Sequence, residues 1–146
     1  MRNHFGAEFN FYIDPEAAHM VLHTFPLSYL VSWECTYTHA VPDATVDRWG
    51  AVGTERAAFF TKICASIRGH EDVGADYCSC DMIAAWAMVK VQEIAFTRVH
   101  ATVELGGRCR ASVLIDHPAI YKRSPNACIV TRIPGYVEGV EEALRD

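Results

Sequence analysis

Two polar residues near the start of the chain, Glu8 and Asn10, have the side-chain types needed to grip a polyol. A carboxylate accepts hydrogen bonds from hydroxyl groups, and an amide both donates and accepts them. Residues 8–13 alternate polar and apolar types, which predicts a short strand with Glu8 and Asn10 on one face. Ligands of open α/β sheets bind outside the carboxyl ends of strands, so the pair is well placed. From spacing alone, a solvated strand edge is the favoured interpretation.

A third candidate is Asp81, which follows Cys80 at the start of an apolar helix predicted over residues 81–92. Taken alone, Asp81 is explained as the N-cap of that helix. The histidines are scattered and do not indicate a metal site or a general base. His19 and His23 lie four residues apart on a predicted helix, where a surface turn accounts for them.

The six cysteines stand mostly alone within apolar segments, which predicts buried free thiols. The close pair in Cys78-Ser79-Cys80 is one residue short of a Cys-x-x-Cys motif, and no second pair stands at a zinc-ribbon spacing. There is also no glycine-rich phosphate loop and no Gly-x-Ser-x-Gly elbow, which argues against phosphoryl and acyl transfer.

Composition places the 146 residues among ordinary globular proteins, with 51% hydrophobic and 21% charged residues. The length suits one domain. The net charge of -5 provides no basic stripe, so nucleic acid is not an expected partner. No apolar run is long enough for a membrane span, and the first residues carry no signal-peptide pattern, so a cytoplasmic location is expected.

The predicted elements alternate between strand and helix. Asp14-Pro15-Glu16 gives start signals for a helix to about Thr24. The other expected elements are a buried central strand over 27–33, helices over 44–49, 54–68, 81–92 and 137–144, a hairpin whose two strands are separated by Gly106-Gly107, and a strand over 127–133. This order predicts an α/β fold with an open, mostly parallel sheet, flanking helices and an antiparallel hairpin.

One longer pattern resembles the signature of a known protein family. The segment Ala7-Glu8-Phe9-Asn10, continued by Asp14-Pro15-Glu16-Ala17-Ala18, resembles the signature of the inosine-uridine preferring nucleoside hydrolase family. Ser79-Cys80-Asp81-Met82-Ile83-Ala84-Ala85 and Val103-Glu104-Leu105-Gly106-Gly107 resemble two later blocks of that family, in the same order. The resemblance covers nearly the whole chain but only about the later half of the family's domain. It implies that residues 1–146 are the C-terminal part of a nucleoside hydrolase domain, with a partial sheet of that fold.

The resemblance also implies roles for individual residues. Glu8 would hold the 5'-hydroxyl of ribose, and Asn10 the 2'- and 3'-hydroxyls. Asp81 would be a calcium ligand that also contacts ribose, and Asn3, at a slightly shorter spacing than the family's, a further sugar contact. Cys80 stands where many members have a histidine that protonates the leaving base, and a thiol is a weaker acid partner at neutral pH.

The largest departure from the family is the absence of its Asp-x-Asp-x-x-x-Asp-Asp motif, which supplies most calcium ligands and the base that activates water. The pairs Asp43 with Asp47 and Asp72 with Asp76 do not reproduce it. Calcium takes about six to eight oxygens, so Asp81 alone would bind it very weakly.

These observations predict a hydrolase of N-glycosidic bonds in ribonucleosides, acting in purine or pyrimidine nucleoside metabolism, whose calcium site is incomplete in this chain. As a fragment or split half, it would be inactive alone. One alternative is a rebuilt site that works within 146 residues. Another is a non-catalytic nucleoside or ribose binder, or a homo-oligomer whose partner covers an exposed sheet edge. A homo-oligomer is the expected assembly.

Overall fold

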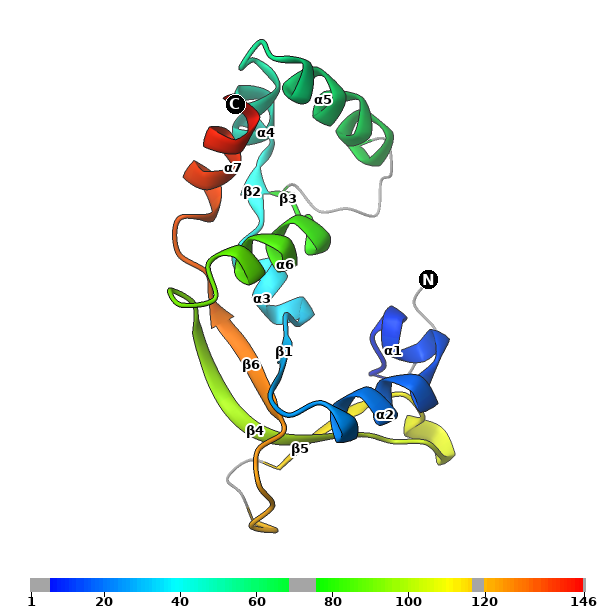
Figure 1. Cartoon of the computed structure of the whole chain (residues 1–146). Helices are drawn as coiled ribbons and strands as arrows, with labels where there is room; N and C mark the ends of the chain where they lie inside the picture. Colours follow the sequence, from blue (N-terminus) through cyan, green and yellow to red (C-terminus); the bar gives the residue numbers. More distant parts are fainter. Residues whose placement is uncertain (1–5, 69–75, 117–119, 146) are drawn as a thin grey trace. The chain divides into compact units, whose positions relative to one another are not determined.

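The computed structural model describes residues 6–68, 76–116 and 120–145 (Figure 1). Residue contacts divide the chain into two compact units. The first unit runs through Ser32 and resumes over Ala95–Thr131, while the second takes in Trp33–Ile94 and the chain from Arg132 onward. No helix in the described ranges combines the length and apolar character needed to cross a membrane. Whether the chain acts as part of one nucleoside hydrolase domain stays a prediction.

The first unit is a four-stranded sheet with helices from the start of the chain. Its elements are α1 (Phe9–Ile13), α2 (Pro15–Thr24), β1 (Ser28–Leu30), β4 (Ala95–Val103), the short 3-10 helix η1 (Gly107–Cys109), β5 (Val113–Asp116) and β6 (Ala127–Arg132). The strand order is β1-β6-β4-β5, with β1 parallel to β6 and β4 antiparallel to β5. The predicted α/β fold with flanking helices and an antiparallel hairpin is confirmed, and the sheet predicted to be open and mostly parallel has both parallel and antiparallel pairs.

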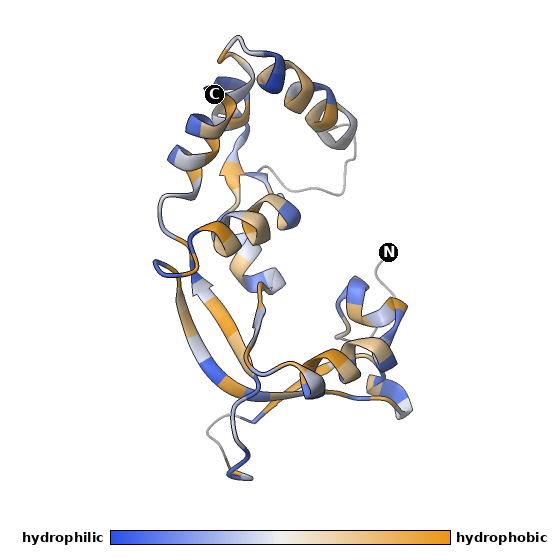
Figure 2. Cartoon of the chain, viewed as in Figure 1, coloured by the Kyte–Doolittle hydropathy of each residue, from blue (hydrophilic) through white to orange (hydrophobic). Residues whose placement is uncertain are grey.

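The core of this unit lies between α2 and the sheet. Its fully buried residues come from α2, β4 and β6 and are Leu22, Val99, Ala101, Val103 and Ala127. The alternating burial of the second half of β4 turns every other residue toward α2. The apolar part of β6 is the orange stretch of that strand in Figure 2. Burial of these side chains is what holds α2, and the residues just before it, on the sheet.

The first described element is a helix where the sequence pattern predicted a strand. Residues 9–13 form α1, and the Glu8 carboxylate caps it by accepting hydrogen bonds from the backbone N–H groups of Asn10 and Phe11. This local side-chain-to-backbone pairing outweighs the weak alternation over six residues. The helix start at Asp14 is confirmed, since its carboxylate accepts from the N–H of Ala17 and Pro15 is the first helical residue.

The strand predicted over 27–33 is shorter and lies elsewhere in the sheet than expected. Only Ser28–Leu30 forms β1, which pairs with β6 and ends the order of the described strands, so the central position was wrong. Leu27 has a φ of 56°, a left-handed conformation that no strand can continue through. Trp33 opens α3, where the Thr36 hydroxyl donates to its carbonyl.

The hairpin is confirmed, but its connection is not a two-residue Gly-Gly turn. β4 and β5 pair from His100 with Asp116 to Val103 with Val113. Beyond Val103, Glu104 exchanges hydrogen bonds with the opposite segment through the N–H of Ala111 and the carbonyl of Ser112. The glycines therefore lie inside a wider loop that contains η1.

The second unit is mostly helical. Its elements are α3 (Trp33–Thr38), β2 (Val41–Pro42), α4 (Asp43–Gly50), α5 (Glu55–Arg68), β3 (Asp76–Tyr77), α6 (Cys80–Val89) and α7 (Tyr136–Arg145). The predicted helices over 44–49, 54–68 and 137–144 are confirmed within a residue or two at each end. The Thr54 hydroxyl caps α5 at the N–H of Ala57. The helix stop predicted at Gly69 lies outside the described residues.

Aromatic rings hold α4 within this unit. Trp49 is completely buried and meets the rings of Phe60 and Tyr136 edge-on. At the surface, the Arg48 guanidinium pairs with the Glu141 carboxylate of α7 at 3.0 Å. The rings supply most of the stabilisation, because exposed ion pairs contribute little.

Candidate functional site

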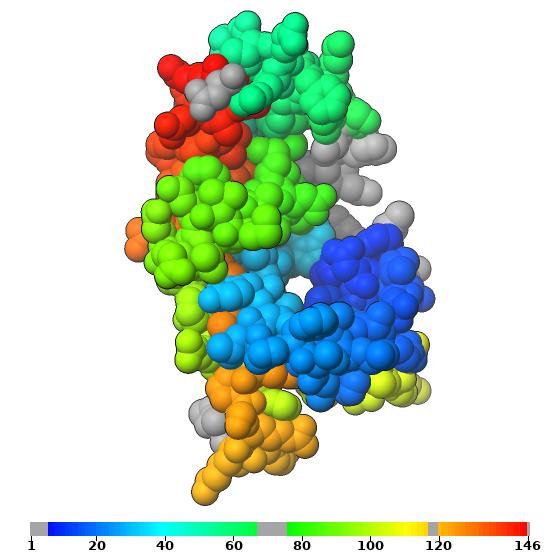
Figure 3. All heavy atoms as spheres, in the orientation of Figure 1, coloured from blue at the N-terminus to red at the C-terminus, as the bar shows by residue number. Residues whose placement is uncertain are grey.

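Glu8 and Asn10 lie side by side, although by a different local structure from the one predicted. One Glu8 oxygen accepts from the backbone N–H groups of Asn10 (2.9 Å) and Phe11 (3.3 Å), and the other accepts from Asn10 Nδ2 (3.2 Å). Asn10 is exposed and Glu8 half-buried. The N-terminal helices that carry them form part of the surface of the first unit (blue, Figure 3).

Among the described residues, this geometry leaves some hydrogen-bonding capacity unused. An ionised carboxylate has about four acceptor positions, of which these contacts use three. The Asn10 side chain keeps one N–H and its carbonyl oxygen for other partners. The pair can therefore bind a molecule with neighbouring hydroxyl groups. Asn3, the further sugar contact implied by the resemblance, lies outside the described residues.

Asp81 lies in the first turn of α6 and is exposed. The N-cap position belongs to Ser79, so the interpretation of Asp81 as the cap was wrong. A carboxylate in the first turn is favourable because it faces the positive end of the helix dipole. No residue within the described ranges donates a hydrogen bond to its oxygens.

Cys80 begins α6 and is half-buried. Burial raises the pKa of its thiol, and the neighbouring Cys78 and Asp81 raise it further, whereas a hydrogen bond with Thr36 lowers it. The thiol is therefore protonated at neutral pH and a weak acid. Thr36, only 1% exposed, is a neighbour of this position that no sequence signal indicated, because it stands on α3, far away along the chain.

The candidate residues fall into two groups. Glu8 and Asn10 belong to the first unit, and Cys80 and Asp81 to the second. Within each group the side chains are neighbours, as the sequence spacing requires. In the described parts of the chain, no three or more His, Cys, Asp or Glu side chains are grouped so that they could hold a metal ion.

The remaining cysteines and histidines fit structural roles. Cys35, Cys64 and Cys128 are buried free thiols as predicted, whereas Cys109 is exposed, contrary to that prediction. His19 and His23 stack with ring centroids 4.0 Å apart on α2, and His23 Nδ1 donates to the His19 carbonyl oxygen at 2.8 Å.

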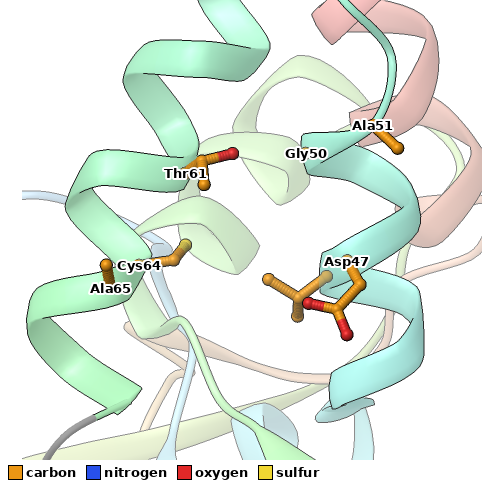
Figure 4. A pocket seen from close by; sticks show the side chains of 7 residues that line it. Asp47, Gly50, Ala51, Thr61, Cys64 and Ala65 are labelled. Atoms are coloured by element: carbon orange, nitrogen blue, oxygen red, sulfur yellow. The ribbon is translucent and has the colours of Figure 1, made fainter.

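A pocket of about 320 Å³ lies between α4 and α5 in the second unit (Figure 4). Its lining residues are Val46, Asp47, Gly50, Ala51, Thr61, Cys64 and Ala65. None of the sequence-predicted sugar or metal contacts is among them. The Thr61 hydroxyl already donates to the Ala57 carbonyl, and Cys64 donates to the Tyr77 hydroxyl at 3.4 Å. Few polar groups are left there to bind a sugar.

Comparison with solved structures gives the same fold in several hydrolases. An inosine-guanosine nucleoside hydrolase matches with a TM-score of 0.82 at 24% identity, over 99% of this chain and 47% of that chain. A purine-preferring ribonucleoside hydrolase from Gardnerella vaginalis matches with a TM-score of 0.78 at 13% identity, over 95% and 47%. A plant nucleoside hydrolase matches with a TM-score of 0.76 at 17% identity, over 96% and 46%. The chain thus spans about half the length of these structures.

Two further comparisons use the sequence itself. A search of curated proteins gives no match, whereas one family model matches. The model for the inosine-uridine preferring nucleoside hydrolases matches residues 3–135, which include the Glu8–Asn10 pair, Cys80 and Asp81. This match covers most of the chain and agrees with the fold. The chain therefore belongs to the inosine-uridine preferring nucleoside hydrolase family.

Proposed function

We propose that this chain provides the ribose-holding part of an enzyme that hydrolyses the N-glycosidic bond of ribonucleosides, releasing ribose and a free base. The observation that carries the proposal is the Glu8–Asn10 pair, which is held together by hydrogen bonds and has Asn10 exposed at the surface. The pair lies within the segment that matches the family.

Glu8 orients Asn10 and keeps one acceptor position for the sugar. In the proposed complex, a ribose hydroxyl, the 5'-hydroxyl by family resemblance, donates to that free position. Asn10 then accepts from one of the 2'- and 3'-hydroxyls and donates to the other, which suits a vicinal diol. Because the Glu8 carboxylate already fixes Asn10, little side-chain entropy is lost on binding.

Calcium is the metal that the family implies, and the described residues do not assemble a site for it. Calcium takes about six to eight oxygen ligands, whereas no suitable group of three or more side chains occurs in the described ranges. We propose only that Asp81 supplies one carboxylate to such a site, with the other ligands coming from outside these residues. Metal binding by this chain alone would then be very weak.

Cys80 is proposed to lie near the leaving base. It carries a proton at neutral pH, because burial raises the pKa of its thiol. A thiol with a raised pKa gives up its proton reluctantly, so its contribution to protonating the base is expected to be small. The sugar contacts and Asp81 therefore carry the proposal, and Cys80 does not.

A specific observation favours a second candidate function. No Asp-x-Asp sequence occurs anywhere in the chain, so the part of the family's site that activates water has no counterpart here. A non-catalytic nucleoside or ribose binder would need the Glu8–Asn10 pair but not that motif. The expected homo-oligomer and the cytoplasmic location stay predictions.

The decisive experiment is an assay of the purified chain on inosine and uridine, with calcium and with a chelator, beside a form extended upstream in its reading frame. We expect no turnover by the 146 residues alone and calcium-dependent turnover by the extended form. Turnover by the shorter form would rule out the fragment interpretation. An extended frame that encodes no Asp-x-Asp, together with nucleoside binding but no hydrolysis, would favour the binder.

A matched pair of variants tests the sugar contacts separately. Asn10→Ala should weaken nucleoside binding, whereas Gln92→Ala, which removes an exposed amide from the second unit, should leave binding unchanged. Binding that is equally strong in both variants would contradict the role of Asn10.

A further inference from the structure

Cys78 and Cys80 are arranged differently from the other thiols of the chain. Both are half-buried, and only Ser79 separates them. Ser79 is extended, with φ -110° and ψ 94°. On an extended segment, alternate side chains point to the same side, so the two thiols face the same way.

The backbone spacing of the pair falls at the upper limit for a disulfide. Two extended steps of 3.2–3.4 Å separate the Cα atoms by roughly 6.4–6.8 Å. Disulfides usually span Cα separations of about 4.4–6.8 Å. A disulfide also needs Cβ atoms about 3.5–4.5 Å apart, so the backbone at Ser79 would have to leave the extended conformation and the bond would be strained.

We propose that Cys78 and Cys80 form a reversible intramolecular disulfide, which makes this segment a site of oxidative modification. Hydroperoxides are the oxidant class. One thiolate attacks a peroxide oxygen, which breaks the O–O bond and leaves a sulfenic acid and water. The second thiol attacks the sulfenic sulfur, forms the S–S bond and releases the oxygen as water. Two thiols and hydrogen peroxide thus give one disulfide and two waters.

Strain in the disulfide shifts the equilibrium between the disulfide and the two thiols toward the thiols. A disulfide near its geometric limit has a more oxidising potential and is reduced easily by other thiols. The pair therefore suits a bond that is readily reduced again rather than a permanent structural bridge.

The bond would alter the start of α6. It would fix the backbone around Ser79 and remove the thiol hydrogen of Cys80, which adjoins Asp81. If the proposed function holds, oxidation would lower nucleoside turnover in the extended form. This consequence rests on the proposed function, whereas formation of the disulfide does not.

Mass spectrometry tests the bond directly. The reduced chain is treated with hydrogen peroxide, its free thiols are blocked with N-ethylmaleimide, and the protein is digested. A Cys109→Ser background removes the exposed thiol that could cross-link two molecules. We expect the peptide with Cys78 and Cys80 to carry no N-ethylmaleimide and to be lighter by two hydrogen atoms than the same peptide with both thiols reduced. Reduced glutathione should restore both blocking sites.

Single-cysteine variants provide the control. Cys80→Ser should give no disulfide and leave a sulfenic acid on Cys78 that dimedone captures, and Cys78→Ser should likewise give no disulfide. The proposal is overturned if Cys78 and Cys80 of the Cys109→Ser protein still react with N-ethylmaleimide after peroxide treatment. It is also overturned if they are oxidised to sulfinic acids without forming a disulfide. Failure of glutathione to reverse the bond would also overturn it. None of these outcomes depends on hydrolase activity.

Discussion

The Glu8 carboxylate holds Asn10 at two points, accepting from its backbone N–H at 2.9 Å and from its side-chain Nδ2 at 3.2 Å. One residue thus caps α1 and orients the amide proposed to bind ribose. If the pair binds ribose as proposed, local folding and ligand binding are coupled at this position, because a change to Glu8 would affect both.

This coupling predicts a non-additive pair of substitutions. Glu8→Ala removes the helix cap, which typically costs 0.5–2 kcal/mol, and also frees Asn10. We expect Glu8→Ala and Asn10→Ala each to weaken nucleoside binding, and the double variant to bind little worse than Glu8→Ala alone. Calorimetric titration with a ribonucleoside measures the affinities, and urea unfolding measures the stabilities. Fully additive losses in affinity would show that the two residues act independently.

The same region shows what the sequence can and cannot predict. The side-chain types of Glu8 and Asn10 suit hydroxyl groups, although their spacing alone favoured a solvated strand edge, and their role stays a prediction. The secondary structure was wrong because alternation over six residues is weak, and the capping bonds of Glu8 decide the conformation. The pair nevertheless stays together, since residues so close in sequence are neighbours in either structure.

Elements with strong local signals were predicted well, and those set by long-range contacts were not. Asp14 and Pro15 specify the start of α2 by themselves. The position of β1 in the sheet depends on its pairing with β6, about a hundred residues later, which periodicity does not encode. Thr36 was missed as a neighbour of Cys80 for the same reason.

Asn126 is predicted to be the most sensitive polar residue of the first unit. Its Nδ2 donates to the carbonyls of Leu22 and Ala101, each at 2.9 Å, and its Oδ1 accepts from the N–H of Ala101 at 2.7 Å. Asn126→Ala leaves these backbone groups without partners, at roughly 1–3 kcal/mol for each buried group. We expect a loss of about 2–4 kcal/mol in the free energy of unfolding, measured in urea.

Two further variants control for this result. Thr97→Ala, at an exposed position of β4, should change stability by less than about 0.5 kcal/mol. Asn126→Asp keeps the acceptor but places a negative oxygen near two carbonyls, so it should be destabilised near neutral pH and partly recover in acid, where it regains a donor. An Asn126→Ala protein as stable as Thr97→Ala would contradict the role of the side chain.

The carboxylate of Glu141 predicts a pH dependence on the acid side. Hydrogen bonds from Arg145 and Arg48 hold the pKa of Glu141 below its usual value of 4.5. A depressed pKa in the folded state means that the stabilisation is present above 4.5 and is lost as the pH falls through the folded-state pKa. We expect Glu141→Gln to lower the urea midpoint near neutral pH and to reduce the further drop between neutral pH and about pH 3.

The neighbouring acid is the control for this effect. Glu142→Gln removes the same charge from an exposed position on α7 and should leave the acid-side drop close to that of the wild type. The effect of Glu141 should be small, because both of its partners are exposed at the surface. Added salt should reduce it further. Identical pH profiles for the two variants would show that the arginine pairs do not form in solution.

Gly139 of α7 lies against the ring of Trp86 in α6, so substitutions at these two positions test whether the ring serves packing or ligand binding. Replacing glycine with alanine inside a helix normally stabilises it by about 1 kcal/mol. At Gly139 an added Cβ would overlap the ring of Trp86, so Gly139→Ala should instead destabilise the protein by about 1–3 kcal/mol. Gly106→Ala, where the added carbon has ordinary contacts and φ is -135°, is the control.

A double-mutant cycle shows whether the ring is the cause. In a Trp86→Ala background the space beside Gly139 is empty, so Gly139→Ala should there be neutral or stabilising. The Trp86 Nε1 donates to the Pro134 carbonyl at 3.3 Å, so its polar edge is also bound within the unit. A tryptophan held at both its ring and its nitrogen is unsuited to stacking on a nucleobase. We therefore expect Trp86→Phe to lower the free energy of unfolding without changing base preference, and a changed preference would assign the ring to the site.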